Sequence, residues 1–134
     1  MSDKRISVVA ALIRDGEGRV LLVRKRGTQA FMQPGGKRDA GESDIAALSR
    51  EIVEELGCCV TESSARPLGV FSCTAANEPG FQVQAAVYAV DVSGTINPKA
   101  EIDRIIWVDP AALPDLPLAP LTRDHVLPLA RAGA

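Results

Sequence analysis

The sequence predicts an α/β protein in which a mixed β-sheet lies between helices. Runs of β-branched and small apolar residues, typical of strands, stand on both sides of one long segment that lacks glycine and proline. A second helix-like segment follows the last strand-like run near the end of the chain. Sheets and helices bury their apolar faces by packing in layers, so we expect helices on the faces of this sheet.

Length, composition and charge are those of an ordinary globular protein. The chain has 134 residues, 46% of them hydrophobic and 24% charged, and its net charge is -2. These values favour one folded domain over residues 1–134. The near balance of charge disfavours a nucleic-acid polymer as a partner. No apolar run approaches the roughly 20 residues that cross a bilayer and no leader pattern is visible, so we expect a cytoplasmic protein without a membrane partner.

The first predicted elements are two strands. Residues 6–13 are rich in β-branched and small apolar residues, residues 15–18 have turn chemistry, and residues 20–23 resume the apolar pattern. This order predicts a β-hairpin. Residues 27–42 then contain four glycines and Pro34, which predicts a loop rather than a regular element.

The strongest helix signal covers residues 43–56. This segment contains no glycine or proline, Ser43 can cap its start, and Gly57 suits its C-terminal end. Its apolar residues recur at three- and four-residue spacing and predict a stripe that faces the core, formed by Ile45, Leu48, Ile52 and Leu56.

The second half of the chain predicts more strands and a closing helix. The strand-like runs cover residues 58–61, 68–74, 81–92 and 105–108. Asp109 and Pro110 predict the start of a short helix, and residues 122–131 predict a terminal helix that Pro128 weakens. The three cysteines lack metal-ligand spacing and are expected to be reduced structural thiols: Cys58, Cys59 and Cys73.

Three glutamates lie on one side of the predicted helix. At about 100° per residue, Glu51, Glu54 and Glu55 fall within an arc of roughly 100°. Like charges at these spacings repel one another, and a hard divalent cation such as Mg²⁺ or Mn²⁺ would relieve the repulsion. Arg50 is placed to hydrogen-bond a neighbouring carboxylate and hold its orientation. The alternative interpretation is a solvated acidic helix face.

The glycine-rich segment before the helix strengthens the first interpretation. Pro34, Gly35 and Gly36 expose backbone groups beside the carboxylates, where they can cradle a phosphate or a metal ion. An ordinary strand-to-helix turn would also account for these residues.

Residues 36–58 resemble the signature box of the Nudix hydrolases, enzymes that cleave nucleoside diphosphates linked to another group. The family pattern is Gly, five residues, Glu, seven residues, Arg-Glu, an aliphatic residue, any residue, Glu-Glu, any residue, Gly and an apolar residue. No required position is missing, and Cys58 is an acceptable final residue. So many fixed identities at fixed spacing make a chance match rare. The matching residues are Gly36, Glu42, Arg50, Glu51, Ile52, Glu54, Glu55 and Gly57.

The resemblance implies a Nudix-type α/β/α sandwich with the box as a loop-helix-loop, and Mg²⁺-dependent pyrophosphohydrolysis, with Mn²⁺ as a substitute metal. It implies that Glu51, Glu54, Glu55 and Gly36 bind the metal. Arg50 would then orient Glu51, and Glu42 would brace the loop or bind through water. The general base that takes a proton from the attacking water varies within the family. Glu51 or Glu54 is the first choice here, with Glu101 and Glu78 as alternatives on later loops.

Substrate contacts are less specific in the sequence. The candidates are Gly35, Lys37, Arg24, Arg26, Glu42 and Glu101. The three cations among them, Lys37, Arg24 and Arg26, could equally be solvated surface residues. Phe31 and Trp107 are expected in the core, and His125 is expected to be structural.

The resemblance leaves the exact substrate open. A nucleoside triphosphate, including an oxidised one, or a nucleotide conjugate is expected, and the competing interpretation is a domain that binds a nucleotide without cleaving it. Many members of the family form homodimers, and the sequence leaves this open. Residues 36–58 hold six acids and three bases, so the near-neutral chain contains one concentrated acidic site, which would repel a polyphosphate unless cations accompany it.

Overall fold

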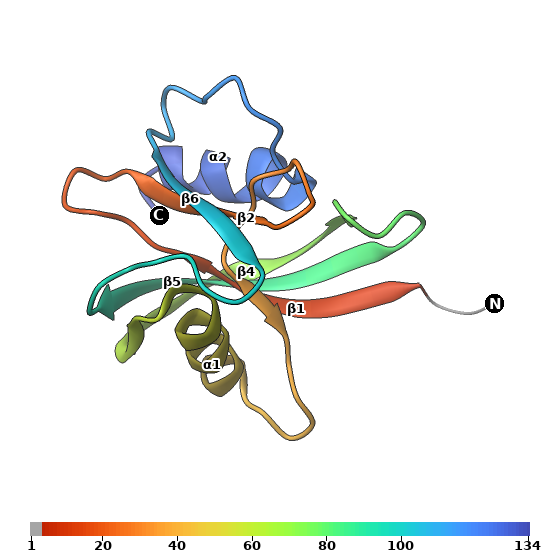
Figure 1. Ribbon diagram of the computed structural model, residues 1–134, viewed down its shortest axis with the longest axis horizontal. Helices are drawn as coiled ribbons and strands as arrows, with labels where there is room; N and C mark the ends of the chain where they lie inside the picture. Colours follow the sequence, from red (N-terminus) through yellow and green to blue (C-terminus); the bar gives the residue numbers. More distant parts are fainter. Residues whose placement is uncertain (1–3) are drawn as a thin grey trace.

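A computed structural model describes residues 4–134 (Figure 1). Its elements follow the chain in this order: β1 (Arg5–Leu12), β2 (Val20–Lys25), β3 (Gly35–Lys37), α1 (Asp44–Leu56), β4 (Cys59–Thr74), β5 (Gln82–Ser93), β6 (Ile102–Val108), the π-helical turn η1 (Thr122–Val126) and α2 (Leu127–Arg131). Within residues 4–134, no helix is both long enough and apolar enough to pass through a bilayer.

The strands form two sheets. The larger is mixed, with the order β3-β1-β5-β4, because β1 runs parallel to β5 while the other pairs are antiparallel. The smaller pairs β2 with β6 in antiparallel fashion. Helices α1 and α2 lie on opposite sides of these strands (Figure 1). The predicted mixed sheet between helices, an α/β/α sandwich, is therefore confirmed.

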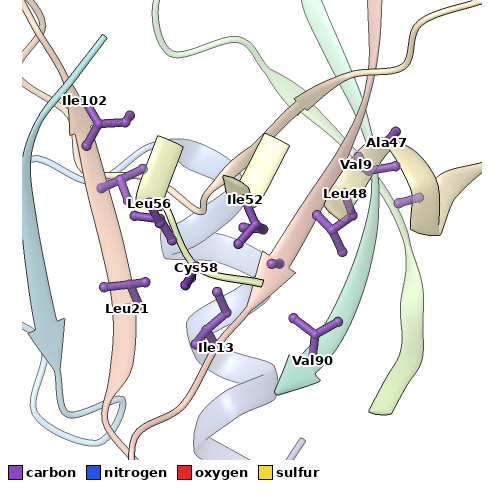
Figure 2. Packing of buried hydrophobic residues seen from close by; sticks show 13 residues of the cluster. Val9, Ile13, Leu21, Ala47, Leu48, Ile52, Leu56, Cys58, Val90 and Ile102 are labelled. Carbon is purple, nitrogen blue, oxygen red and sulfur yellow. The ribbon is translucent and has the colours of Figure 1, made fainter. Parts of the chain in front are cut away.

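Two hydrophobic clusters hold the layers together. Neighbouring residues of a strand point to opposite faces, so β1 and β2 contribute to both clusters. The odd-numbered residues 9, 11, 21 and 23 pack with Leu48, Ile52 and Leu56 of α1 (Figure 2). The even-numbered residues 10, 12, 20 and 22 pack with Val126, Leu127 and Ala130 of the C-terminal helical segment.

The predicted hairpin between β1 and β2 is wrong for most of its length. The two strands meet only near the turn, where Arg14 bridges to Val20 and the Leu21 N–H donates to the Ile13 carbonyl. Beyond that point each strand joins a different sheet. Local turn chemistry predicted the reversal of the chain correctly, but the partners of a strand are set by contacts distant in sequence.

The expected loop over residues 27–42 contains a short strand, β3, which pairs with β1. At Gly35, with φ 146°, an added Cβ would lie 2.1 Å from the Val9 carbonyl oxygen. A residue with a side chain could not approach β1 this closely. The predicted loop is therefore wrong at Gly35, because glycine here permits close pairing of two strands.

Helix α1 follows the prediction closely. The Ser43 hydroxyl accepts from the Ala46 N–H at 3.1 Å, and Gly57 ends the helix at φ 71°. Leu48, Ile52 and Leu56 are fully buried, whereas Ile45 lies at the margin of the core. The local capping and spacing signals were therefore sufficient to predict this element.

The later elements bring three more corrections. The runs 58–61 and 68–74 are parts of one strand, β4, whose pairing with β5 has two irregularities. Asp109 begins a turn and no helix: its side chain accepts from the Ala111 N–H at 2.9 Å. The terminal helix is interrupted by η1, which ends two residues before Pro128, and the ring of Pro128 would clash with the carbonyl four residues earlier in a regular α-helix. All three cysteines are free, as expected.

Candidate active site

The glutamates Glu51, Glu54 and Glu55 stand on α1 in three different environments. The Glu51 side chain is 16% exposed and that of Glu54 is 52% exposed, while Glu55 as a whole residue is only 4% exposed. The face of α1 that carries them turns toward β3, the strand that packs beside it. Within about one turn of α1, the acidic residues therefore range from the exposed Glu54 to the buried Glu55.

Arg50 ties the loop before α1 to these acids. Its Nη1 donates to Glu51 Oε1 at 2.9 Å, while Nε and Nη2 donate to the two Glu42 oxygens, each at 2.8 Å. Nη2 also donates to the Lys37 carbonyl at 3.0 Å. The hydrogen bonds from Arg50, followed by one from the Asp39 N–H, lower the pKa of Glu42 to about 2. This network fixes the orientation of Glu51 and the course of the loop.

Glu55 is the most deeply placed acid of the site. Its Oε1 accepts from the Gly35 N–H at 2.9 Å. Burial raises its pKa to about 8, and the negative charges of Glu51 and Glu101 add to that rise, whereas Gly35 and Lys25 oppose it. Burial also raises the pKa of Glu51. The site therefore concentrates carboxylates without enough positive charge to balance them.

Gly36 allows the strand to approach these acids. A Cβ at this position would lie 2.6–2.8 Å from the carboxyl atoms of Glu51, well inside contact distance. The backbone of β3 thus packs directly on the carboxylate, which is the arrangement expected if a backbone oxygen and a carboxylate share one ligand.

Lys25, at the end of β2, is a site residue that the sequence analysis missed. Its Nζ lies 3.4 Å from Glu101 Oε1, and its charge lowers the pKa values of Glu51 and Glu55. The neighbouring Arg24 points the other way, to Asp103 and to the ring of Phe31. Strand alternation was the available signal, because only one of two adjacent cations on a strand can face α1.

The loop before β6 brings Glu101 to the site. The Glu101 carbonyl accepts from the Arg26 N–H at 2.7 Å, and the Lys99 N–H donates to the Glu55 carbonyl at 2.9 Å. Ala100 between them has φ 53°, an uncommon value for a residue with a Cβ. The Lys99 bond therefore holds this loop against α1, and the Arg26 bond fixes Glu101 at the end of β2, although the three segments are far apart in sequence.

A pocket of about 400 Å³ opens beside the acids. Glu51, Gly36, Lys37 and Glu101 line one part of it, and Glu78 lines another. Neither Arg24 nor Arg26 lines it, and Phe31 is buried in the core with 1% exposure. Trp107 packs at the edge of the core cluster around α1, and His125 stacks on Phe71 at a centroid distance of 4.9 Å.

Comparison with known proteins agrees with the architecture of the site. The family model of the NUDIX domain matches residues 3–130. The chain belongs to this family.

The relatives of this Nudix hydrolase include one curated enzyme and many solved structures. The 8-oxo-dGTP diphosphatase of Haemophilus influenzae is 44% identical over 61 residues, which cover 42% of this chain and 45% of that protein. The match thus spans less than half the length of the curated relative. The solution structure of the E. coli ORF135 protein is 30% identical, covers 97% of this chain and 89% of its own, and has a TM-score of 0.73. The crystal structure of the MutT NUDIX hydrolase from Burkholderia pseudomallei is 28% identical, covers 96% of each chain and has a TM-score of 0.75.

The donor set of the Nudix box suits a hard divalent ion. It supplies carboxylate oxygens, and burial raises the pKa values of two of its carboxyls, Glu51 and Glu55, which favours a cation that can replace their protons. Among residues 4–134, no three acidic, histidine or cysteine side chains already converge on one point as a metal site. Arg50 on Glu51 and the Gly35 N–H on Glu55 hold the acids in the present arrangement.

Proposed function

We propose that this Nudix hydrolase is a cytoplasmic Mg²⁺-dependent pyrophosphohydrolase that cleaves a diphosphate linkage in a nucleoside triphosphate or a nucleotide conjugate. We take residues 1–134 as one catalytic domain. The observation that carries the proposal is an acidic helix beside a pocket large enough for a small ligand: Glu51 of α1 lines this pocket, and Glu55 lies buried on the same helix. A polyphosphate can approach such a wall only together with cations.

We assign metal binding to Glu51, Glu54, Glu55 and the backbone of Gly36. A bound Mg²⁺ would neutralise diphosphate oxygens and lower the pKa of the attacking water, and Mn²⁺ is expected to substitute for it. Glu55 fits the role because its buried carboxyl lacks a full positive partner. Glu54 is the most exposed of the three and can turn toward an incoming ion.

The general base is assigned to Glu51 or Glu54, with Arg50 as the residue that orients Glu51. The hydrogen bond of 2.9 Å between Arg50 and Glu51 supports this arrangement. Glu101 and Glu78, which line the pocket from other loops, are the alternative bases.

Substrate phosphates are assigned to Lys25, Lys37 and the backbone of Gly35. These groups belong to the pocket wall beside the acids. Arg24 and Arg26 remain weaker candidates, because Arg24 is paired with Asp103 and the guanidinium of Arg26 reaches the Ala100 carbonyl at 3.4 Å. Glu42 acts on the loop through Arg50.

The relative from Haemophilus influenzae suggests an oxidised purine nucleotide as one substrate to examine first. The assay would measure release of pyrophosphate or phosphate from 8-oxo-dGTP, the common nucleoside triphosphates, sugar nucleotides and dinucleotides, with Mg²⁺ and with Mn²⁺.

Glu54→Gln and Glu55→Gln test the assigned roles. We expect each to lower kcat on the best substrate on the order of 10²-fold or more, because each removes a negative metal ligand. Glu17→Gln is the matched control, since Glu17 is 76% exposed in the turn between β1 and β2 and pairs with Arg19. Unchanged turnover in both box variants would contradict the assignment. Nucleotide binding by the wild-type protein without turnover under either metal would favour the non-catalytic interpretation.

A further inference from the structure

The acids form only a small share of the pocket wall. Apolar side chains such as Ile6, Val8 and Val83, from β1 and β5, line it too. Two buried polar residues also belong to this wall: Gln33, which is 6% exposed, and Thr122, which is 0% exposed. A mostly apolar pocket with a few polar groups is typical of sites that orient a small ligand.

The orientation of the Gln33 amide is fixed by its neighbour. Its Nε2 donates to the Ala11 carbonyl at 3.0 Å. A carbonyl can only accept, so the nitrogen must face Ala11 and Oε1 must face away from it. Gln33 therefore presents an acceptor, and not a donor, on its other side.

That acceptor lacks a protein partner. Among residues 4–134, three buried side-chain oxygens lack a hydrogen bond, and two of them, Gln33 Oε1 and Thr122 Oγ1, belong to residues that line the pocket. Buried polar atoms in folded proteins are nearly always paired, and an unpaired one destabilises the fold. A ligand held in this pocket can supply the missing partners.

Thr122 lies at a special point of the backbone. It is the first residue of η1, and its carbonyl accepts from the Leu127 N–H, five residues later. Single π-helical turns of this kind occur frequently at functional sites. The Thr122 hydroxyl can donate as well as accept, so it complements the acceptor of Gln33.

We infer that Gln33 is a specificity-determining residue that accepts a hydrogen bond from an N–H group on the base of the nucleotide, with the Thr122 hydroxyl as a second polar contact. This inference rests on the proposed function, because it assigns the base to the apolar part of the pocket and the phosphates to the acidic part. The ligand class is a nucleotide whose base presents an N–H donor at its edge. Loss of this contact should weaken base recognition and leave phosphate recognition unchanged.

The test measures binding and requires no turnover. Isothermal titration calorimetry compares dGMP, dAMP, dCMP and dTMP with deoxyribose 5-phosphate, on the wild-type protein and on Gln33→Met. We expect the wild type to bind at least one nucleotide at least tenfold more tightly than the sugar phosphate. Gln33→Met should weaken that nucleotide about tenfold, the usual size for one lost hydrogen bond, and change the sugar phosphate less than twofold.

A second measurement leaves the protein unchanged, in case Gln33→Met fails to fold. Nucleotides methylated in turn at each N–H of the preferred base are titrated against the wild type, and at least one should bind about tenfold more weakly. Thr122→Val, which removes the hydroxyl and keeps the shape, should also reduce the preference for the base.

The outcomes separate the two proposals. Equal affinities for nucleotides and sugar phosphate in the wild type would overturn the role of Gln33, as would an unchanged nucleotide preference in Gln33→Met or tolerance of every methylated base. Selective nucleotide binding that depends on Gln33, with no hydrolysis of any triphosphate, sugar nucleotide or dinucleotide under Mg²⁺ or Mn²⁺, would support the inference and overturn the proposed catalytic function.

Discussion

Glu51 and Glu55 have the same side chain but different surroundings: a cation binds the first, and a backbone N–H group binds the second. Glu51 is held by Arg50, while Glu55 is buried under β3 and accepts from the Gly35 N–H. Burial raises the pKa of both carboxyls. Their spacing on α1 could be read from the sequence, but their depth depends on how β3 packs against the helix.

The contact of Gly36 with Glu51 gives a test at this scale. Gly36→Ala would place a Cβ 2.6–2.8 Å from the Glu51 carboxyl group, so the carboxylate must move. We expect kcat to fall by 10-fold or more, because a displaced ligand and base lose their alignment. Steady-state kinetics on the best triphosphate would measure the change. Gly16→Ala is the control, since its Cβ would have no neighbour within 4 Å, and equal kcat values for the two variants would contradict the argument.

Two residues, Lys25 and Gln33, show where sequence reasoning stopped. Both lie outside the Nudix box: Lys25 comes from the end of β2 and pairs with Glu101, and the side chain of Gln33 is held by its hydrogen bond to Ala11 of β1. The resemblance to a family motif identifies the residues of that motif. It says nothing about side chains that the fold brings to the motif from elsewhere.

Helix α1 is held at its N-terminus by a second network, separate from Arg50. Asp44 accepts from Tyr88 on β5 and from Arg38 in the loop, each at 2.6 Å. Arg38 also donates to Ser7 of β1 at 2.8 Å. These hydrogen bonds lower the pKa of Asp44, with Arg38 as the first cause and Tyr88 as the second. The loop of the Nudix box is therefore attached to the sheet as well as to its own helix.

Tyr88→Phe tests this attachment. The variant removes a hydrogen bond to a charged, half-buried carboxylate, and we expect the free energy of unfolding to fall by about 1–2 kcal/mol. Urea denaturation followed by circular dichroism would measure it. Ser7→Ala, which removes the more exposed bond to Arg38, is the control and should lower it by less than about 0.5 kcal/mol. Equal stability of Tyr88→Phe and the wild type would show that the bond to Asp44 contributes nothing.

The elements that could be predicted from sequence are those with local signals. Helix α1 carries its cap, its apolar stripe and its terminal glycine within 15 residues, from Ser43 to Gly57. The partners of β1 and β2 depend instead on strands as distant as β5 and β6, so turn chemistry alone gave a hairpin that splits into two sheets. The alternation of residues along β5 predicts a strand, but nothing in the sequence of β1 or β5 indicates that the two strands pair in parallel.

In the whole molecule, one helix carries both core residues and the concentrated charge. Leu48, Ile52 and Leu56 fix α1 to the strands (Figure 2), and the glutamates occupy the neighbouring side of the helix. Residues outside the Nudix box carry nearly equal numbers of acids and bases. The stability of the metal-free protein should therefore respond to pH mainly through the box.

Removal of metal makes this dependence measurable. In EDTA, Glu55 keeps its proton in the folded state up to a pKa of about 8, whereas the unfolded chain loses it near 4.5. The folded state then binds more protons between these values, so the free energy of unfolding should fall as pH rises from about 4.5 to about 8. The slope is at most about 1.4 kcal/mol for each pH unit. Urea titrations at several pH values would record it.

Two comparisons isolate the cause of the slope. Glu55→Gln has no proton to lose and should show a flatter profile than the wild type, while Glu17→Gln should keep the wild-type profile. Saturating Mg²⁺ should raise stability most at the upper end of the range, because the ion binds the deprotonated acids of the folded state. A wild-type stability that rises with pH across this window in EDTA would show that Glu55 is ionised in the fold.

The divergence of β1 and β2 has a consequence for how substrate size can change among related proteins. The two strands are joined at the turn of residues 15–18 and part toward the pocket, where Ile6 and Val8 stand on one and Lys25 on the other. The distance between the two strands is therefore smallest near the turn and largest at the pocket, and this distance sets how wide the pocket is. Insertions in that turn would leave this width as it is, whereas a bulkier or smaller side chain packed between the two sheets would change it. The width of the pocket can thus vary without moving the acids only by repacking the even-numbered face of β1 and β2, because the odd-numbered face packs on α1.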